Sequence, residues 1–259
     1  MRTDLVIKLG GSAITQKDTP YTPNSVVIKR IAQEFSSSWG GRRVLLVHGG
    51  GSFGHRAAIK YIDGSGKLCS PIGIAETRHA MHRLTSLLAE SFLEKGVPFF
   101  AIDPSACFFY EEEGAKQNLQ YDLQPVELAL SAGLLPSLGG DVVLSSRRHG
   151  RILSGDTIAR ILALESSAEL LAFGTDVDGY IEGGKTLGKI GRGALREMIA
   201  ATKGKSNDVT GGMPGKLSEI GEYLSSGGRR ALIFNATRPG TVQRLLRGEE
   251  VEGTYIDID

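Results

Sequence analysis

The sequence predicts an α/β protein, an open and mostly parallel central sheet held between helices on both faces. Three observations predict this class. Short apolar runs of β-type residues alternate with segments whose apolar residues recur at helical spacing, which is typical of βαβ units. The 259 residues are 41% hydrophobic and can fill a large core. Many of the 35 glycines stand where a predicted strand ends.

The first half of the chain alternates regularly between the two kinds of segment. Apolar runs predict four strands, at Leu5–Leu9, Val44–Val47, Pro98–Ile102 and Leu134–Leu138. Helical spacing predicts a helix containing Val27, Ile31 and Phe35, a long helix over Ile74–Lys95 that Gly96 ends, and a short helix over Pro125–Ala132 that Gly133 ends. We expect a small hairpin of Val142–Leu144 with Arg151–Leu153, and we assign the aromatic runs Phe99-Phe100 and Phe108-Phe109-Tyr110 to the core.

A second half starts near Ser154-Gly155-Asp156. Its predicted elements are helix Thr157–Leu164, strand Glu169–Phe173, a flexible loop at Glu182–Lys189, helices Ala194–Ala201 and Lys216–Ser225, strand Arg230–Phe234, helix Gly240–Arg247 and a final edge strand at Tyr255. The chain shows no linker between the halves. We therefore expect one domain of two lobes, at about residues 1–153 and 154–259, that share a single sheet.

Composition argues against several classes of partner. The net charge is +1 and the basic residues are scattered, so neither a nucleic-acid nor a membrane partner is expected. Cys69 and Cys107 form no metal or disulfide pattern and fit a reducing cytoplasm. His79 and His82 share a helix face without a third ligand, so we expect no protein metal site. The first predicted strand begins close to Met1, so we expect no signal peptide.

The most informative segment is the run from His48 to His55, His-Gly-Gly-Gly-Ser-Phe-Gly-His. It follows an apolar strand, and its glycines allow backbone N–H groups to approach an anion closely. His48 ends the strand and is compatible with a bond to the backbone alone. His55 follows the turn, where it can donate to an anion or serve only in packing. We interpret this turn as a phosphate site.

A second glycine turn, Gly10-Gly11-Ser12, follows the first strand, with Lys8 before it and Lys17 after it. The order differs from a P-loop, because the lysine precedes the glycines. Lys8 lies in an apolar strand and needs a partner. Lys17 can neutralise charge on a transferred phosphoryl group or can be a solvated loop lysine. Two such turns in one sheet predict two facing anions and hence phosphoryl transfer.

Ligands of open parallel sheets bind where the strands end, and the turns after Leu9, Val47 and Leu138 converge there with Thr175-Asp176. Asp156 begins a helix, where it can cap the N-terminus or hold the lysines. A third turn, Asn207–Lys216, precedes a helix whose N-terminus favours phosphate. The alternative for that turn is an ordinary Gly/Pro loop.

These motifs resemble the amino-acid kinase superfamily over almost the whole chain, and within it the isopentenyl phosphate kinases. The resemblance is carried by Lys8–Ser12 with Ile14–Lys17, by His48–His55, by Thr175–Gly179 and by Asn207–Lys216. The histidine block is the most specific motif. The segment Glu182–Lys189 departs from the family, because it lacks the Tyr-x-x-(Asp)-Pro pattern.

The resemblance implies ATP-dependent conversion of isopentenyl phosphate to isopentenyl diphosphate with Mg²⁺, by a homodimer of the amino-acid kinase fold. It implies that Lys8, Lys17 and Lys216 stabilise the transferred phosphoryl group and that Asp156 organises them. The nucleotide side would comprise Gly10, Gly11, Ser12, Gly50, Thr175, Asp176, Asp178, Gly179, Thr210, Gly211 and Gly212. The acceptor phosphate would contact Gly49, Gly54 and His55, with Gly140 nearby.

Two questions stay open on the sequence. Ile74 and Thr77 share a helix face and either line a slot for the acceptor's alkenyl tail or pack against the sheet. The competing functions are phosphorylation of a phosphonate such as fosfomycin, and a non-catalytic regulator of the same fold that binds a nucleotide or effector. The three lysines argue against the regulator, because a module that only binds needs no cations around a transfer point.

Overall fold

The computed structural model of the chain describes residues 1–114, 116–202 and 212–257. Its centre is an eight-stranded sheet with the order β13-β15-β14-β10-β1-β2-β7-β4. The strands are β1 (Leu5–Leu9), β2 (Val44–His48), β4 (Phe99–Ile102), β7 (Leu135–Gly139), β10 (Leu170–Thr175), β13 (Lys189–Ile190), β14 (Arg230–Asn235) and β15 (Gly253–Asp257). From β4 to β14 neighbouring strands pair in parallel, while β15 runs antiparallel to β14.

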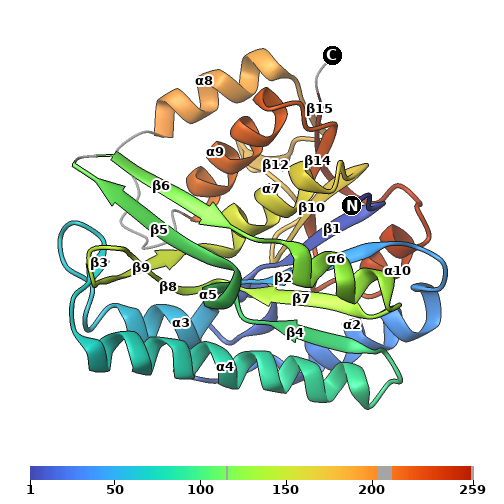
Figure 1. Cartoon of the computed structure of the whole chain (residues 1–259). Helices are drawn as coiled ribbons and strands as arrows, with labels where there is room; N and C mark the ends of the chain where they lie inside the picture. Colours follow the sequence, from blue (N-terminus) through green and yellow to red (C-terminus); the bar gives the residue numbers. More distant parts are fainter. Residues whose placement is uncertain (115, 203–211, 258–259) are drawn as a thin grey trace.

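Helices cover both faces of the sheet (Figure 1). One face carries α2 (Ser25–Ser38), α3 (Gly51–Ala58), α4 (Pro71–Leu93) and α10 (Thr241–Leu246). The other carries α6 (Gln124–Ser131), α7 (Gly155–Glu165), α8 (Arg192–Thr202) and α9 (Gly212–Ser225). The three layers confirm the predicted fold class, and the helices and strands predicted for these layers are present with ends shifted by at most about four residues.

The core consists of two apolar clusters, one on each side of the sheet. Leu5, Ile7 and Leu9 of β1 join the cluster under α2 and α4, whereas Val6 joins the cluster under α7 and α9. A strand buried on both faces reads as a continuous apolar run, which is why β1 was recognisable in the sequence. By the same alternation, Lys8 lies on the face of Val6 and is directed toward α7.

Smaller elements surround the sheet. They are the helices α1 (Gly11–Ile14) and α5 (Pro104–Cys107), the hairpin β5 (Phe108–Glu113) with β6 (Lys116–Tyr121), the sheet β3 (Lys67–Leu68), β9 (Gly150–Leu153) and β8 (Asp141–Leu144), and the hairpin β11 (Ile181–Glu182) with β12 (Lys185–Thr186). The predicted hairpin of residues 142–144 with 151–153 is therefore part of a three-stranded sheet. Hairpin β5–β6 projects from one end of the molecule (Figure 1).

Three expectations were wrong. Tyr255 lies in β15, which is not an edge strand because β13 pairs along its outer side. The segment Glu182–Lys189 is not simply a loop, since β11 and β12 form a hairpin there; strands of two residues are too short to show a period. Phe100 and Phe109 are 43% and 51% exposed, because β4 is an edge strand and the β5–β6 hairpin turns one face outward.

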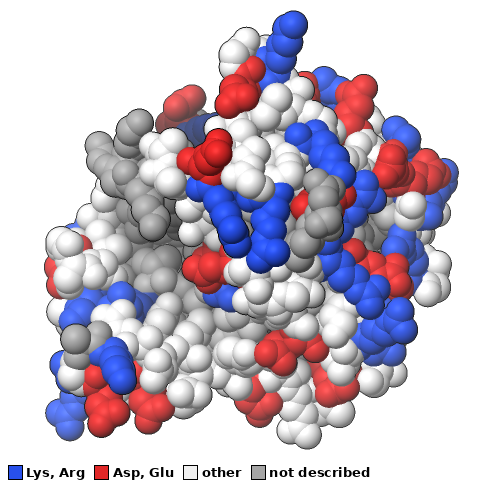
Figure 2. Space-filling model, turned by 90° about the horizontal axis from the view of Figure 1, so that it is seen from above, with Lys and Arg blue, Asp and Glu red and all other residues white. Residues whose placement is uncertain are grey.

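Nothing in the described ranges is a helix long and apolar enough to cross a bilayer. On the face shown in Figure 2, basic and acidic side chains are interspersed. The thiols of Cys69 and Cys107 are both free.

The two glycine turns that follow β1 and β2 touch each other through their backbones. A Cβ atom at Gly11 would lie 2.3 Å from the Gly51 nitrogen, and one at Gly49 would lie 2.8 Å from the Gly11 nitrogen. Thr15 fastens the contact: its hydroxyl donates to the Gly11 carbonyl at 2.7 Å and accepts from the Ser52 N–H at 3.0 Å. Only glycine permits so close an approach, and this contact places the turn after β1 directly against the turn after β2.

We therefore expect Gly11→Ala to lower the free energy of unfolding by about 1–3 kcal/mol, as overpacking does. The matched control is Gly64→Ala, because a Cβ atom at Gly64 meets nothing within 4 Å. Urea unfolding followed by circular dichroism measures both variants. Equal stability of the two variants would contradict the proposed contact between the turns.

Candidate functional site

A cavity of about 610 Å³ opens at the carboxyl ends of β1, β2, β7 and β10. The convergence of strand ends that the sequence predicted is therefore present. The residues singled out from the sequence that line it are Lys8, Gly10, Gly11, Ser12, Lys17, Gly49, Gly50, Gly54, His55, Thr77, Gly140, Asp156, Thr175, Asp176, Gly212 and Lys216.

The floor of the cavity holds a buried cluster of three charges. The Asp156 carboxylate lies 2.6 Å from Lys8 Nζ and accepts bonds of 3.1 and 3.2 Å from Lys216 Nζ. The three residues are 7%, 7% and 5% exposed in the order Lys8, Asp156 and Lys216. They come from β1, α7 and α9. The cluster carries one more positive than negative charge, and all three residues line the cavity.

The cap of α7 settles what Asp156 does. The N-cap residue is Ser154, whose hydroxyl accepts from the Thr157 N–H at 3.0 Å. Asp156 therefore does not cap the helix, and its carboxylate oxygens bond to the two lysines. Of the two interpretations that the sequence left open, the structure supports the one in which Asp156 holds lysines.

Burial and charge act in opposite directions on the pKa values of this cluster. Burial alone raises the pKa of Asp156, but the charges of Lys216 and Lys8 outweigh it and bring the pKa to about 2. Burial lowers the pKa of Lys216 to about 8; the charge of Lys8 adds to this effect and Asp156 opposes it. Asp156 is thus firmly ionised, while Lys216 holds its proton near neutral pH and releases it in mild alkali.

Lys17 lies at the cavity but belongs to a different pair. Its Nζ is 2.7 Å from Asp176 Oδ2, and its side chain is 63% exposed. Burial raises the pKa of Asp176, but bonds from Lys17 and Ser12 outweigh it and leave the pKa lowered. Asp156 therefore holds two of the three lysines, and Asp176 of the Thr175–Gly179 loop holds the third across the cavity mouth.

The two histidines of the glycine block have different environments. His48 is completely buried, with Nδ1 3.2 Å from the Gly49 carbonyl and Nε2 3.0 Å from the Thr85 hydroxyl. Burial lowers its pKa to about 4 although the Gly49 bond opposes the shift, so the ring is neutral and structural. His55, on α3, lines the cavity. It is the histidine of this block that can meet a ligand.

Some of the expected residues lie elsewhere. Ile74 is not among the residues that line the cavity and lies against Gly150 of β9. Asp178 accepts bonds from Asn235 and Arg238 at 2.8 and 2.6 Å. Thr210 and Gly211, with the rest of the turn before Gly212, fall outside the described residues.

A second, apolar hollow of about 350 Å³ adjoins the first and is lined by Val177, Gly179, Tyr180, Ile181, Met213, Pro214 and Leu217. It shares Val177 and Met213 with the main cavity. Gly179 therefore belongs to this hollow and not to the charged floor.

The sequence did not point to Asp141, Met81 or Ile152, which also line the cavity. Burial raises the pKa of Asp141 to about 7, although the Val142 N–H and Arg78 oppose the shift. A signal for Asp141 was present, because it follows Gly139-Gly140 at the end of a predicted strand. Met81 and Ile152 gave no signal, because their residue types are ordinary in a helix and a strand.

The described residues contain no group of three His, Cys, Asp or Glu side chains that could hold a metal ion. Asp156, the carboxylate of the cavity floor, already bonds to two lysines.

Comparison with known proteins identifies the family of the chain. The model of the amino acid kinase family matches residues 5–235. An isopentenyl phosphate kinase of Methanocaldococcus jannaschii is 31% identical, with 97% of this chain and 98% of the relative covered. An isopentenyl phosphate kinase of Methanothermobacter thermautotrophicus is 33% identical, again with 97% of this chain and 98% of the relative covered. A solved structure titled as isopentenyl phosphate kinase superposes with a TM-score of 0.74 at 29% identity, covering 97% of this chain and 99% of the other.

Replacing Asp156 by Asn should destabilise the fold by about 3–5 kcal/mol at pH 7, because two buried lysines lose their counter-charge. The pKa of Asp156 is about 2 in the fold against an ordinary 3.8. Its stabilisation is therefore complete above about pH 4 and is lost as the pH falls toward 2.

The free energy of unfolding of the wild type should accordingly fall between pH 4 and 2 more steeply than that of Asp156→Asn. Urea unfolding at pH 7, 4 and 3 measures both effects. Asp18→Asn, which alters an exposed carboxylate, serves as control and should behave like the wild type. If Asp156→Asn is as stable as the wild type at pH 7, Asp156 does not have this role.

Proposed function

The chain belongs to the amino acid kinase family, with full-length similarity to isopentenyl phosphate kinases, and from this premise we propose that it transfers the γ-phosphoryl group of ATP to isopentenyl phosphate. An acceptor phosphate oxygen attacks the γ-phosphorus and the bond to the β–γ bridging oxygen breaks. The products are isopentenyl diphosphate and ADP.

The observation that carries this proposal is the Lys8–Asp156–Lys216 cluster beneath two touching glycine turns. Each turn offers backbone N–H groups to one anion, and the cluster leaves a net positive charge between them. An ionised phosphate acceptor needs no general base. Catalysis then consists of holding the two anions in line and neutralising the charge that develops between them.

We assign the two sides of the cavity as follows. Gly49, Gly54, His55 and Gly140 face the acceptor phosphate, and Thr77, Met81 and Ile152 face its apolar tail. The nucleotide phosphates lie along Gly10, Gly11, Ser12, Gly50 and Gly212, with Thr175 and Asp176 beside them. The adjoining hollow between Tyr180 and Leu217 suits an adenine base, since it is apolar and opens beside the phosphate side. The acceptor lobe is then about residues 1–153 and the ATP lobe about 154–259.

In this proposal Mg²⁺ would enter with ATP, as is common for nucleotide sites. Asp176, which lines the cavity and pairs with Lys17, would be the residue to hold it. The metal would neutralise phosphate charge. The lysines supply the protein's own share of that neutralisation.

Two further features complete the proposal. We place the enzyme in the cytoplasm, where ATP is supplied and an exposed thiol such as that of Cys69 stays reduced. We also propose a homodimer. Analytical ultracentrifugation of the purified chain tests the dimer directly.

A coupled ADP-release assay over a panel of acceptors tests the activity. We expect ADP release with isopentenyl phosphate and little with fosfomycin, glutamate or no acceptor. Release that needs fosfomycin would replace the proposed acceptor. ATP and acceptor binding without turnover would instead identify a regulatory protein, which the paired lysines of the cavity floor do not favour.

His55 decides whether the acceptor side is assigned correctly. A protonated imidazole beside a dianionic phosphate makes a charge-assisted bond, which contributes about 1.5–3 kcal/mol. His55→Ala should therefore weaken binding of isopentenyl phosphate by about tenfold or more and leave ATP binding within about twofold. His55→Gln should be intermediate, because one neutral donor remains.

Calorimetry with each ligand separately measures these effects. His79→Gln, at an exposed position on α4, controls for the loss of an imidazole. Equal acceptor affinity in all four proteins would remove His55 from the phosphate site.

A further inference from the structure

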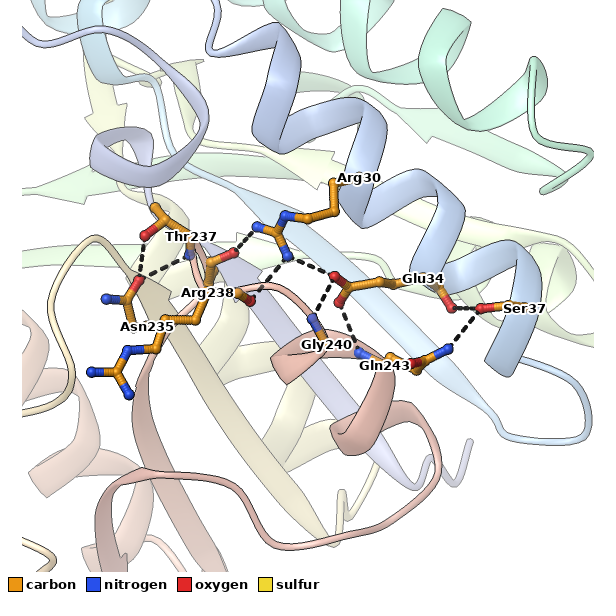
Figure 3. Close-up of polar contacts among 9 residues, drawn as sticks. Arg30, Glu34, Ser37, Asn235, Thr237, Arg238, Gly240 and Gln243 are labelled. Atoms are coloured by element: carbon orange, nitrogen blue, oxygen red, sulfur yellow. Dashed lines mark hydrogen bonds and ion pairs between the residues drawn. The ribbon is translucent and has the colours of Figure 1, made fainter.

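Another buried carboxylate, Glu34 of α2, organises the region beyond the end of β14 (Figure 3). It is 7% exposed, and its two oxygens accept from three donors. Arg30 Nη1 donates to Oε1 at 2.6 Å and the Gly240 N–H donates to the same oxygen at 2.9 Å. The Gln243 N–H donates to Oε2 at 2.9 Å. Glu34 therefore fixes the start of α10 from a neighbouring helix.

Arg30 donates hydrogen bonds to two backbone carbonyls of the same region. Its Nη2 donates to the Ala236 carbonyl at 2.6 Å, and its Nη1 donates to the Arg238 carbonyl at 3.0 Å. The turn from Asn235 to Gly240, here called the β14–α10 turn, is thus held from α2 at two carbonyls and one N–H. A planar guanidinium can serve Glu34 and two carbonyls at once, which a lysine ammonium does poorly.

The β14–α10 turn also donates hydrogen bonds to the loop Thr175–Gly179. The Ala236 N–H donates to the Thr175 carbonyl at 2.9 Å. Asn235 Nδ2 and Arg238 Nη2 donate to the two oxygens of Asp178 at 2.8 and 2.6 Å. The turn therefore holds this loop at both of its ends.

That loop forms one wall of the active-site cavity. Thr175, Asp176 and Val177 line it, and Asp176 pairs with Lys17 across the mouth. Val177 and Gly179 also line the adjoining apolar hollow. The position of the loop thus determines the width of the space that we assign to the nucleotide.

We propose that Glu34 and Arg30 are positioning residues for the nucleotide: through the β14–α10 turn they hold the Thr175–Gly179 loop in the geometry that binds ATP. The inference rests on the proposed function for the identity of that ligand. Neither residue lines the cavity, so neither is a catalytic residue. The acceptor side, formed by the turn after β2 and by α3 and α4, has no part in this chain of contacts.

The inference differs from a purely structural role in what it predicts for the two substrates. If these contacts only stabilise the fold, their loss lowers the melting temperature and leaves the affinities of the folded protein for nucleotide and acceptor unchanged. A positioning network, when broken, selectively weakens nucleotide binding. Arg42 provides a matched control, because its Nη1 donates to the Leu245 carbonyl at the far end of the same helix α10, at 3.2 Å. Its side chain is 26% exposed, against 20% for Arg30.

The experiment compares Glu34→Gln, Arg30→Lys and Arg42→Lys by calorimetry with ADP in the absence of acceptor, and by melting temperature. Glu34→Gln and Arg30→Lys should raise the Kd for ADP roughly 3- to 30-fold, with the KM for isopentenyl phosphate within about twofold of wild type. Arg42→Lys should lower the melting temperature by a few degrees, about as much as Arg30→Lys, and leave the Kd for ADP unchanged. Unchanged ADP affinity in both Glu34→Gln and Arg30→Lys would overturn the inference.

The contact between Arg238 and Asp178 is tested by Arg238→Met. The Arg238 side chain is 48% exposed, so its loss is compatible with folding. Arg238→Met should weaken ADP binding, and combining it with Glu34→Gln should add less than the product of the two separate effects. Fully multiplicative effects would mean that the two residues act independently, which contradicts the network.

ADP binding needs no acceptor, and this separates the inference from the proposed function. A wild-type protein that binds ADP but does not phosphorylate isopentenyl phosphate refutes the proposed acceptor and leaves the network to be judged by the variants. A wild-type protein without affinity for ADP refutes the nucleotide assignment and the inference together.

Discussion

The bond of one buried carboxylate to two buried lysines is the constraint on which this molecule depends. Two ammonium groups would be too costly to bury without Asp156, and Asp156 would be too costly to bury without them. Satisfying all three requires that β1, α7 and α9 meet at one point. The packing of α7 and α9 against the sheet is therefore also the packing that completes the cavity floor. Its surplus positive charge is what a phosphoryl group in transfer requires.

Close backbone contact provides a second requirement of the proposed transfer, because it brings together the two turns that we propose as anion sites. The turn after β1 and the turn after β2 touch because Gly11 and Gly51 have no side chains, and Thr15 bonds to both turns. Adjacent parallel strands place their ends side by side, so the sheet aims both turns at the same space. Glycine here determines distance, and the lysines beneath determine charge.

The wall of the cavity is supported from farther away. Asp176 and Thr175 lie at the end of β10, but the β14–α10 turn holds their loop and α2 holds that turn (Figure 3). A helix on one face of the sheet thus supports a loop that lines a cavity built by elements of both faces. The same arrangement explains a charged pair, Arg30 and Glu34, on a helix whose neighbouring positions are apolar core.

Local patterns in the sequence were sufficient for the fold class, most of the elements, the glycine turns and the need of Lys8 for a partner, because backbone periodicity and glycine chemistry are properties of short segments. They did not identify Asp176 as the partner of Lys17, the role of Glu34, the exposure of Phe100, or the position of β15 inside the sheet. Each of these depends on which distant segments become neighbours and in what register. Helical spacing alone shows Glu34 only as a polar residue on α2. One of its three donors lies in its own helix, and the other two lie at the end of the β14–α10 turn and in the first turn of α10, 206 and 209 residues later. Only the layered packing of the sheet brings them together.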